Sequence, residues 1–313
     1  MARRVLVAGA TGQIGELLTP ALVAVGDEVY GLARSENSAE KVRELGATPV
    51  MGDALDRDAV MAAVAEAKPE VIVHQLTAIP RGGINPRKMD EAFGPTTRLR
   101  REATRHLVEA AEQHGVRRLV AQSIAFAYRH EGPEVLDESA PLDTDAPGLA
   151  DIVGGVAALE EAVLGSSAVE GVVLRYGMFY GPDSAYSPNG SYGEMVTKRR
   201  LPIIGDGNGR QSFIQIDDAV SATLAAIDRG SGVYNVVDDE PARAREWVPG
   251  LAEALGAKPP RHAPAWLARL AAGPAAVRVM TTQRGASNAR IKQELGWEPR
   301  YTDWRSGFPT LTA

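Results

Sequence analysis

Hydrophobic and polar positions alternate between two patterns in the first half of the chain. Short runs of β-branched and aliphatic residues predict strands, and the stretches between them carry hydrophobic residues at helical spacing. The predicted strands are 3–9, 27–34, 48–53, 69–75, 116–123 and 171–177, and the predicted helices are 12–26, 39–46, 57–67 and about 96–114. Because the strands are hydrophobic throughout and helices connect them, we expect an α/β fold with a doubly wound, parallel Rossmann sheet.

The pattern changes after Gly181. Residues 181–193 are rich in Pro, Gly and Ser and predict a loop. A strand at 213–216, a helix at 217–230 and a strand at 232–237 are expected to return to the main sheet, and helical segments follow at 244–256, 263–273 and 287–296. We therefore predict a dinucleotide-binding domain of residues 1–175 with 213–238, and a small C-terminal substrate lobe of residues 176–212 with 239–313.

Composition narrows the possible partners. The net charge of −6 makes nucleic acid and anionic membranes poor candidates, and no hydrophobic run reaches the ~18 residues that a membrane span needs. The chain contains no Cys, which excludes disulfides and thiolate metal sites, and its five His show no metal-ligand spacing. We expect a cytoplasmic protein without a metal that acts on a small molecule.

A glycine-rich loop joins the first predicted strand to the first helix. In "GATGQIG", Gly9 permits a tight turn, Gly12 lets the backbone approach a pyrophosphate, and Gly15 lets helix and strand pack closely. The helix N-terminus then offers N–H groups to the phosphates. The residues that we assign to the cofactor here are Gly9, Thr11, Gly12, Gln13, Ile14 and Gly15, with Leu76 after the fourth strand.

The end of the second strand indicates which dinucleotide binds. An NAD site usually has an acidic residue there, whereas this chain has Arg34 and no acid before Glu36. A guanidinium suits the 2′-phosphate of NADP, so we predict NADP with Arg34 as its charged partner; a solvated surface Arg is the alternative. After the third strand, Asp53 and Ala54 either border the adenine or form an ordinary turn.

The chain resembles the extended short-chain dehydrogenase/reductase family, which includes nucleotide-sugar epimerases and dehydratases. The resemblance covers nearly the full length and rests on ordered segments such as "GATGQIG", "GDALD", "LRYGMFYGP" and "LPIIGDGNGRQSFIQIDDAV". It implies a Rossmann domain with NAD(P), a small substrate lobe, and possible homodimers formed through two long helices. It also implies a Ser or Thr after the fifth strand, then a catalytic Tyr followed four residues later by a Lys that binds the nicotinamide ribose.

The chain departs from that family where the chemistry should be. Alignment on "ALEEAV" puts Ile152 at the place of the Tyr and Val156 at the place of the Lys, and neither can move a proton. Ile124 falls where the Ser or Thr is usual. Ser123 and Tyr128 are the nearest candidates for orienting a substrate oxygen and donating a proton, although Tyr128 could equally be a packed ring.

Three functions stay open for such an atypical member. The first is an NADP(H)-dependent oxidoreductase that reduces a carbonyl of a small, fairly apolar substrate. The second is a non-redox isomerase, cyclase or lyase on the same scaffold. The third is a binding protein that senses NADP and catalyses nothing.

Other residues are expected at the pocket, which we place at the carboxyl edge of the sheet. The candidates for substrate binding are Gln75, Thr77, Tyr176 and Arg210. His74 is expected to be structural, and His130 to lie on a surface loop. The adjacent Gly154 and Gly155 either start their helix late or let its backbone approach cofactor or substrate.

Overall fold

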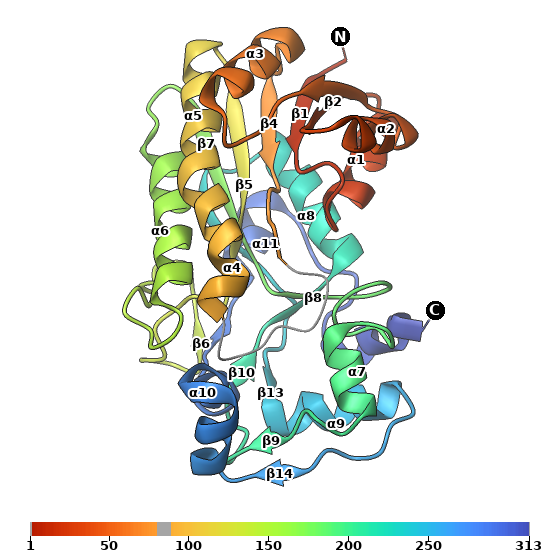
Figure 1. The fold of residues 1–313 in the computed structure, drawn as a ribbon, viewed down its shortest axis with the longest axis vertical. Helices are drawn as coiled ribbons and strands as arrows, with labels where there is room; N and C mark the ends of the chain where they lie inside the picture. The colour runs from red at the N-terminus through yellow and green to blue at the C-terminus, as the bar shows by residue number, and fades with distance from the viewer. Residues whose placement is uncertain (1, 80–88, 313) are drawn as a thin grey trace.

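Seven parallel strands form the central sheet of the protein (Figure 1). The computed structural model describes residues 2–79 and 89–312. From one edge to the other, the strands are β12 (Gly232–Val236), β7 (Glu170–Tyr176), β5 (Arg118–Ile124), β4 (Val71–His74), β1 (Arg4–Ala8), β2 (Glu28–Ala33) and β3 (Thr48–Met51). The strand order reverses between β1 and β4, so the prediction of a doubly wound Rossmann sheet is confirmed.

Helices cover both faces of this sheet. One face carries α3 (Arg57–Ala67), α5 (Thr104–Gln113) and α6 (Ala150–Gly165), and the other carries α1 (Gly15–Ala24), α2 (Glu36–Glu44), α8 (Ile216–Asp228) and α11 (Ala289–Leu295). Alternate residues of one strand enter different cores: Val5 and Val7 pack under α1, while Leu6 and Ala8 pack under α3 and α5. Burial on both faces explains why the strands are hydrophobic throughout.

The helix predicted to begin near residue 96 begins earlier. Helical structure runs through α4 (Met89–Arg98), a π-helical turn η2 (Leu99–Ala103) and α5. Pro95 lies inside α4, where a proline is unfavourable because it removes a backbone hydrogen bond. Packing of α4 against α6 favours the helix in spite of Pro95, an interaction between distant segments that local pattern does not contain.

The return of the chain to the main sheet is only partly as predicted. Strand β12 joins the sheet beside β7. The segment predicted at 213–216 does not: β11 (Phe213–Gln215) pairs instead with β8 (Met178–Tyr180) in a separate two-stranded sheet. Ile214 enters the core beneath α1, while Phe213 enters a second core. Strand β11 therefore contributes side chains to both the core beneath α1 and the second core.

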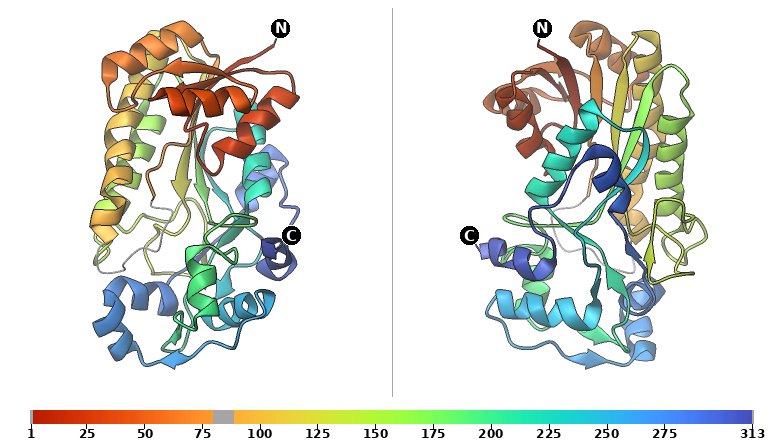
Figure 2. Two further views of the ribbon diagram at one scale, coloured as in Figure 1. Left: turned by 45° about the vertical axis from the view of Figure 1, so that its right-hand side comes forward. Right: turned by 180° about the vertical axis from the view of Figure 1, so that it is seen from behind.

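The second core lies beyond the carboxyl ends of the main strands (Figure 2). Its centre is aromatic, with Tyr180, Tyr186, Phe213, Trp247 and Phe308 in mutual ring contact. The surrounding elements are α7 (Ser191–Thr197), β9 (Ile203–Ile204), β10 (Arg210–Gln211), β13 (Ala242–Arg243), α9 (Ala244–Ala254), β14 (His262–Ala263), α10 (Ala265–Thr281), α12 (Trp304–Gly307) and η3 (Phe308–Thr312). The paired strands β6 (Val135–Leu136) and β15 (Gly285–Ala286) belong to a separate small cluster with Tyr128.

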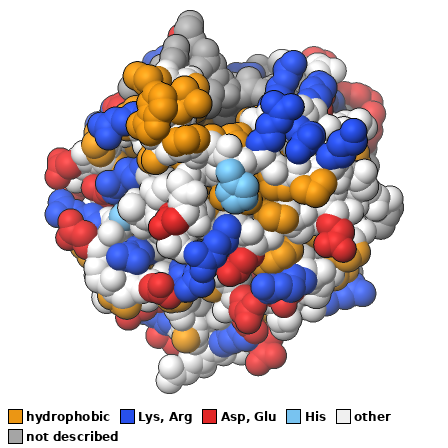
Figure 3. All heavy atoms as spheres, turned by 90° about the horizontal axis from the view of Figure 1, so that it is seen from below, with side chains coloured by type: hydrophobic (Ala, Val, Ile, Leu, Met, Phe, Trp, Pro, Cys, Tyr) orange, Lys and Arg blue, Asp and Glu red, His pale blue; other side chains and the backbone are white. Residues whose placement is uncertain are grey.

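Helix α10 differs from the other helices of this region. Gly273 has φ 85° and kinks it, directly before Pro274. Before the kink the helix exposes Trp266, Leu267 and Leu270, and the face of the molecule seen from below carries a group of exposed hydrophobic side chains (Figure 3). Within the described residues, no helix is both long and hydrophobic enough to cross a membrane.

Candidate functional site

The glycine-rich loop has the geometry that a bound pyrophosphate requires. Gly9 has φ +99°, and a Cβ there would lie 2.8 Å from the Gln75 carbonyl oxygen. A Cβ on Gly15 would lie 2.1 Å from the Gly9 carbonyl oxygen. No side chain caps the N-terminus of α1. The N–H groups of Glu16 and Leu17 donate to the carbonyls of Gly12 and Ile14, but within the described residues those of Gln13, Ile14 and Gly15 have no acceptor, which leaves them for phosphate oxygens. The loop therefore fits a dinucleotide.

The residues proposed to bind the adenosine half lie around this loop. Arg34 follows β2 directly and is exposed, just before the capping box of Ser35 and Ser38 that starts α2. Asp53 is also exposed, and its Oδ1 accepts a hydrogen bond of 2.9 Å from the Leu55 N–H, as in an ordinary turn. Ala54 is buried beside it. Their roles toward the cofactor stay predictions.

At the end of β4, the chain turns from the sheet toward the second core. His74 is buried, its Nε2 lies 2.9 Å from the Thr104 Oγ1, and burial and the nearby Arg100 lower the pKa of its imidazole to about 4. It is thus neutral near pH 7, which suits the expected structural role. Gln75 is buried on the other face, and its Oε1 has no hydrogen-bond partner among the residues that the structure describes. Leu76 is half-buried and Thr77 exposed.

Hydrophobic packing replaces the expected catalytic pair on α6. Ile152 and Val156 are both buried, and Val156 packs with Ile124 and Ala127 at the end of β5. The helix begins at Ala150, so the alternative of a late start is wrong. The absence of a side chain at Gly155 instead allows close contact with α4.

This contact between α6 and α4 is tight. A Cβ on Gly155 would lie 2.9 Å from the Thr97 Cγ2, and one on Gly154 would lie 3.2 Å from an Arg101 nitrogen. The two glycines therefore allow close packing of α6 against α4 and η2, and their approach to a ligand stays a prediction.

Ser123 and Tyr128 belong to a buried polar network. Arg175 binds Glu160 through two hydrogen bonds, of 2.9 and 2.6 Å, and the Ser123 hydroxyl donates to the same carboxylate at 2.6 Å. A third Arg175 nitrogen donates to the Tyr128 oxygen at 2.8 Å, and that hydroxyl donates to Asn235 at 2.7 Å. The network, shared between β5, α6, β7 and β12, ties helix to sheet.

This placement bears on the predicted catalytic roles. Tyr128 is only 2 % exposed, its hydroxyl is occupied on both sides, and burial raises its pKa. Ser123 is fully buried on the same network. Catalysis by these two residues stays a prediction, and the arrangement favours a structural role for both.

The other predicted substrate residues also have partners. The Tyr176 hydroxyl lies 2.6 Å from the Thr223 Oγ1 and accepts from Gln75 at 3.3 Å, and burial raises its pKa to about 12. Arg210 lies on β10 and pairs with Glu134. The structure thus places Gln75 and Tyr176 together, and Arg210 elsewhere.

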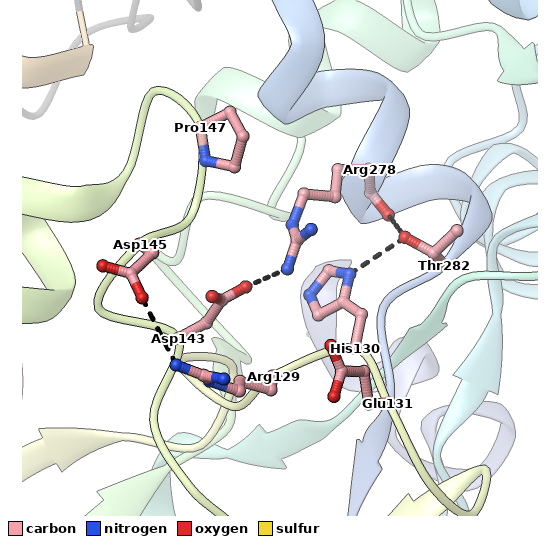
Figure 4. Close-up of a pocket in the computed structure, with 8 residues that line it drawn as sticks. All are labelled: Arg129, His130, Glu131, Asp143, Asp145, Pro147, Arg278 and Thr282. Carbon is pink, nitrogen blue, oxygen red and sulfur yellow. Dashed lines mark hydrogen bonds and ion pairs between the residues drawn. The ribbon is translucent and has the colours of Figure 1, made fainter.

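A separate cavity of about 390 Å³ lies between the loop that follows β5 and helix α10 (Figure 4). His130 reaches Thr282 across it, at 3.0 Å from Nδ1 to Oγ1, and Arg278 pairs with Asp143. Burial and two nearby arginines lower the His130 pKa to about 4. His130 lies on the loop after β5, as expected, but is half-buried there. No group of His, Cys, Asp or Glu in the described ranges could hold a metal ion.

Sequence reasoning missed three charged residues of the buried region. Arg100, Glu160 and Arg175 are each 4 to 6 % exposed. The sequence did contain a signal for Arg175. This residue interrupts an otherwise hydrophobic strand, and a buried charge needs a partner. Its partner Glu160 lies one helical turn after Val156, and nothing local distinguishes it from the exposed Glu161.

The fold and the glycine-rich loop define a dinucleotide-binding protein of Rossmann type. The chain belongs to the NAD dependent epimerase/dehydratase family, whose model matches residues 5–236. Members of this family depend on a nicotinamide dinucleotide, and together with the relatives below this makes the chain an oxidoreductase or a related enzyme.

Reductases are among the curated relatives. A 3-diazoavenalumate denitrifying reductase from a Streptomyces species is 49 % identical over 308 residues, which cover 97 % of this chain and 99 % of the relative. A 4-hydroxy-2-methyl-3-oxo-4-farnesyl-3,4-dihydroquinoline-1-oxide ketoreductase from Stigmatella aurantiaca is 28 % identical over 261 residues, covering 82 % and 74 %.

Solved structures resemble the whole chain. A UDP-glucose 4-epimerase from Thermotoga maritima, solved with UDP-glucose, has a TM-score of 0.76 at 20 % identity, covering 98 % of this chain and 97 % of that one. The UDP-glucose 4-epimerase from Thermus thermophilus, in complex with NAD, has a TM-score of 0.72 at 26 % identity, covering 98 % and 97 %. The first likeness is one of fold alone.

Proposed function

We propose that the protein is an NADP(H)-dependent reductase that replaces a diazo group of a small, fairly apolar acid by hydrogen. One observation carries the proposal: the dinucleotide loop is intact, while hydrophobic side chains occupy the places of the Tyr and Lys. The diazo substrate is suggested by the 49 % identical relative, which is a denitrifying reductase of a diazo compound.

The chemistry of the substrate explains why the pair is dispensable. Reduction of a carbonyl creates an alkoxide, and a Tyr beside a Lys normally protonates it. When NADPH is bound it would supply a hydride. At a diazonium carbon the C–N bond breaks, its electron pair leaves with N₂, and the hydride forms the new C–H bond. No oxyanion develops, so this reaction needs no proton donor, whereas the carbonyl reduction predicted from sequence does.

In such a reaction the glycine-rich loop and the hydrophobic residues of α6 only bind the reactants and exclude water. Gly9, Gly12 and the N-terminus of α1 would hold the pyrophosphate. Ile152 and Val156 keep the α6 wall hydrophobic, which favours a substrate without sugar hydroxyls and keeps water from a reactive electrophile. The protein thus positions two reactants and excludes water.

An isotope experiment tests the reaction. With NADPH deuterated on the transferred position and a diazo or diazonium derivative of a hydrophobic aromatic acid, we expect one deuterium at the carbon that lost nitrogen, with N₂ released in equal amount. Tyr128→Phe should retain turnover when it is folded, because no proton donor is required. A ketone on the same skeleton is the comparison substrate. Turnover of the ketone but not of the diazo compound would contradict the proposal.

The preference for NADP rests on Arg34. Replacing Arg34 by Ala should weaken binding of NADPH by at least ~1.5 kcal/mol, the value of a lost charged hydrogen bond, and leave NADH binding unchanged. Calorimetric titration of both cofactors measures the difference. Arg43→Ala, which removes an exposed arginine of α2 that pairs with Glu36 and Glu40, is the matched control. Equal losses for NADPH and NADH would argue against contact with a 2′-phosphate.

A further inference from the structure

Arg100 is a buried cation in the π-helical turn between α4 and α5. It is 4 % exposed and lies in η2, which packs against α6. Burial lowers its pKa to about 10, so it still carries its charge at neutral pH. Because a charge held largely out of water is costly unless its neighbours balance it, the charges around Arg100 need to be accounted for.

The neighbouring charges do not neutralise Arg100. Glu160 is the acidic group that acts on it, but this carboxylate already binds Arg175 through two hydrogen bonds. His74, on the opposite side, is neutral at pH 7. These side chains therefore hold two positive charges and one negative charge, which leaves one buried positive charge in excess.

The position of Arg100 relates it to the missing Lys. Arg100 follows Thr97 by three residues, so both lie on the face of α4 and η2 that packs against α6. Thr97 touches Gly155, and its buried Oγ1 has no hydrogen-bond partner in the described part of the chain. On α6, Val156 stands one turn before Glu160, with which Arg100 interacts. The guanidinium thus lies opposite the turn of α6 where the family places its Lys.

We infer that Arg100 replaces that Lys from the facing helix and supplies the positive charge beside the nicotinamide end of the bound dinucleotide. Its N–H groups would donate to ribose oxygens, as the Lys does in the family. The end of β4, where His74 neighbours Arg100, is continuous with Gln75, which touches the glycine-rich loop. A positive charge at this place repels the oxidised nicotinamide ring, which is itself cationic, and leaves the reduced, neutral ring unaffected. Arg100 therefore favours binding of the reduced cofactor.

The inference depends on nicotinamide binding and not on the diazo substrate, so it is tested with cofactors alone. We expect the wild-type protein to bind NADPH at least about fivefold more tightly than NADP⁺. In Arg100→Met the ratio of the two dissociation constants should fall by about fivefold or more, because both cofactors lose the ribose hydrogen bonds while only NADP⁺ is freed from the charge repulsion. Arg100→Lys keeps the charge and should keep the ratio within about twofold. Titration calorimetry or quenching of tryptophan fluorescence measures both constants.

Arg101→Met is the matched control. Arg101 lies in the same turn, is half-exposed and pairs with Asp151, so its loss should leave the ratio unchanged. Arg100→Gln replaces Arg100→Met if circular dichroism shows the latter to be unfolded. A folded uncharged variant with an unchanged ratio would overturn the inference, and so would a wild-type protein that binds both cofactors equally well. Loss of the diazo reaction with an intact ratio would instead contradict the proposed function.

Discussion

Replacing Glu160 by Ala should destabilise the protein by about 3–5 kcal/mol, because the change leaves buried arginines without their counter-charge. Glu160 accepts two hydrogen bonds from Arg175 and one from Ser123, and it is the acidic neighbour of Arg100. Its removal exposes two cations to each other in a region of low dielectric. Urea denaturation followed by circular dichroism measures the loss as a change in the free energy of unfolding.

Two further variants make this test specific. Glu161→Ala removes an exposed carboxylate from the next position of α6 and should change stability by less than about 0.5 kcal/mol. Glu160→Ala combined with Arg175→Met should lose less than Glu160→Ala alone, since one unpaired charge is removed. Equal stability of Glu160→Ala and Glu161→Ala would show that the network does not stabilise the fold.

Gly15→Ala should abolish dinucleotide binding, because the new methyl group would lie 2.1 Å from the Gly9 carbonyl oxygen and 2.6 Å from Ala10. These are backbone atoms, so relief requires movement of the loop that faces the pyrophosphate. We expect affinity for NADPH to fall by at least about 100-fold, as for the loss of several charged hydrogen bonds. Equilibrium titration measures it, with the circular dichroism spectrum as a check of folding.

Gly165→Ala is the control for this change. Gly165 ends α6, and a Cβ there would meet nothing within 4 Å. This substitution should leave cofactor affinity unchanged and raise stability slightly, by up to about 1 kcal/mol, because Ala favours the helix. If Gly15→Ala bound NADPH as well as Gly165→Ala does, the loop would not be the cofactor site.

The sequence was most informative where one local rule fixes one local geometry. The roles expected of Gly9 and Gly15 follow from backbone freedom and close approach, and the observed φ of Gly9 and the contacts at Gly15 agree with them. The same reasoning could not distinguish Glu160 from Glu161, since both occupy equally good helical positions. Only the tertiary structure distinguishes them, because Glu160 lies on the side of α6 that faces Arg175 whereas Glu161 is exposed.

Pattern also missed what packing between distant segments decides. Helix α4 begins before the predicted start near residue 96 because α6 packs against it, and Phe213 joins the aromatic core instead of the main sheet. Ser123 and Tyr128 were chosen by their position after the fifth strand. Their partners Glu160 and Asn235 lie 37 and 107 residues away along the chain.

By itself, the sequence determined the Rossmann architecture, the cofactor loop and the loss of the Tyr and Lys, because each is written in adjacent residues or in a regular period. Tertiary structure alone decided where the charges of the site lie. Arg100, Glu160 and Arg175 come from a π-helical turn, a helix and a strand, and only the packing of these elements brings them together in the interior. The free energy of a buried charge depends on its neighbours, and those neighbours are distant in sequence.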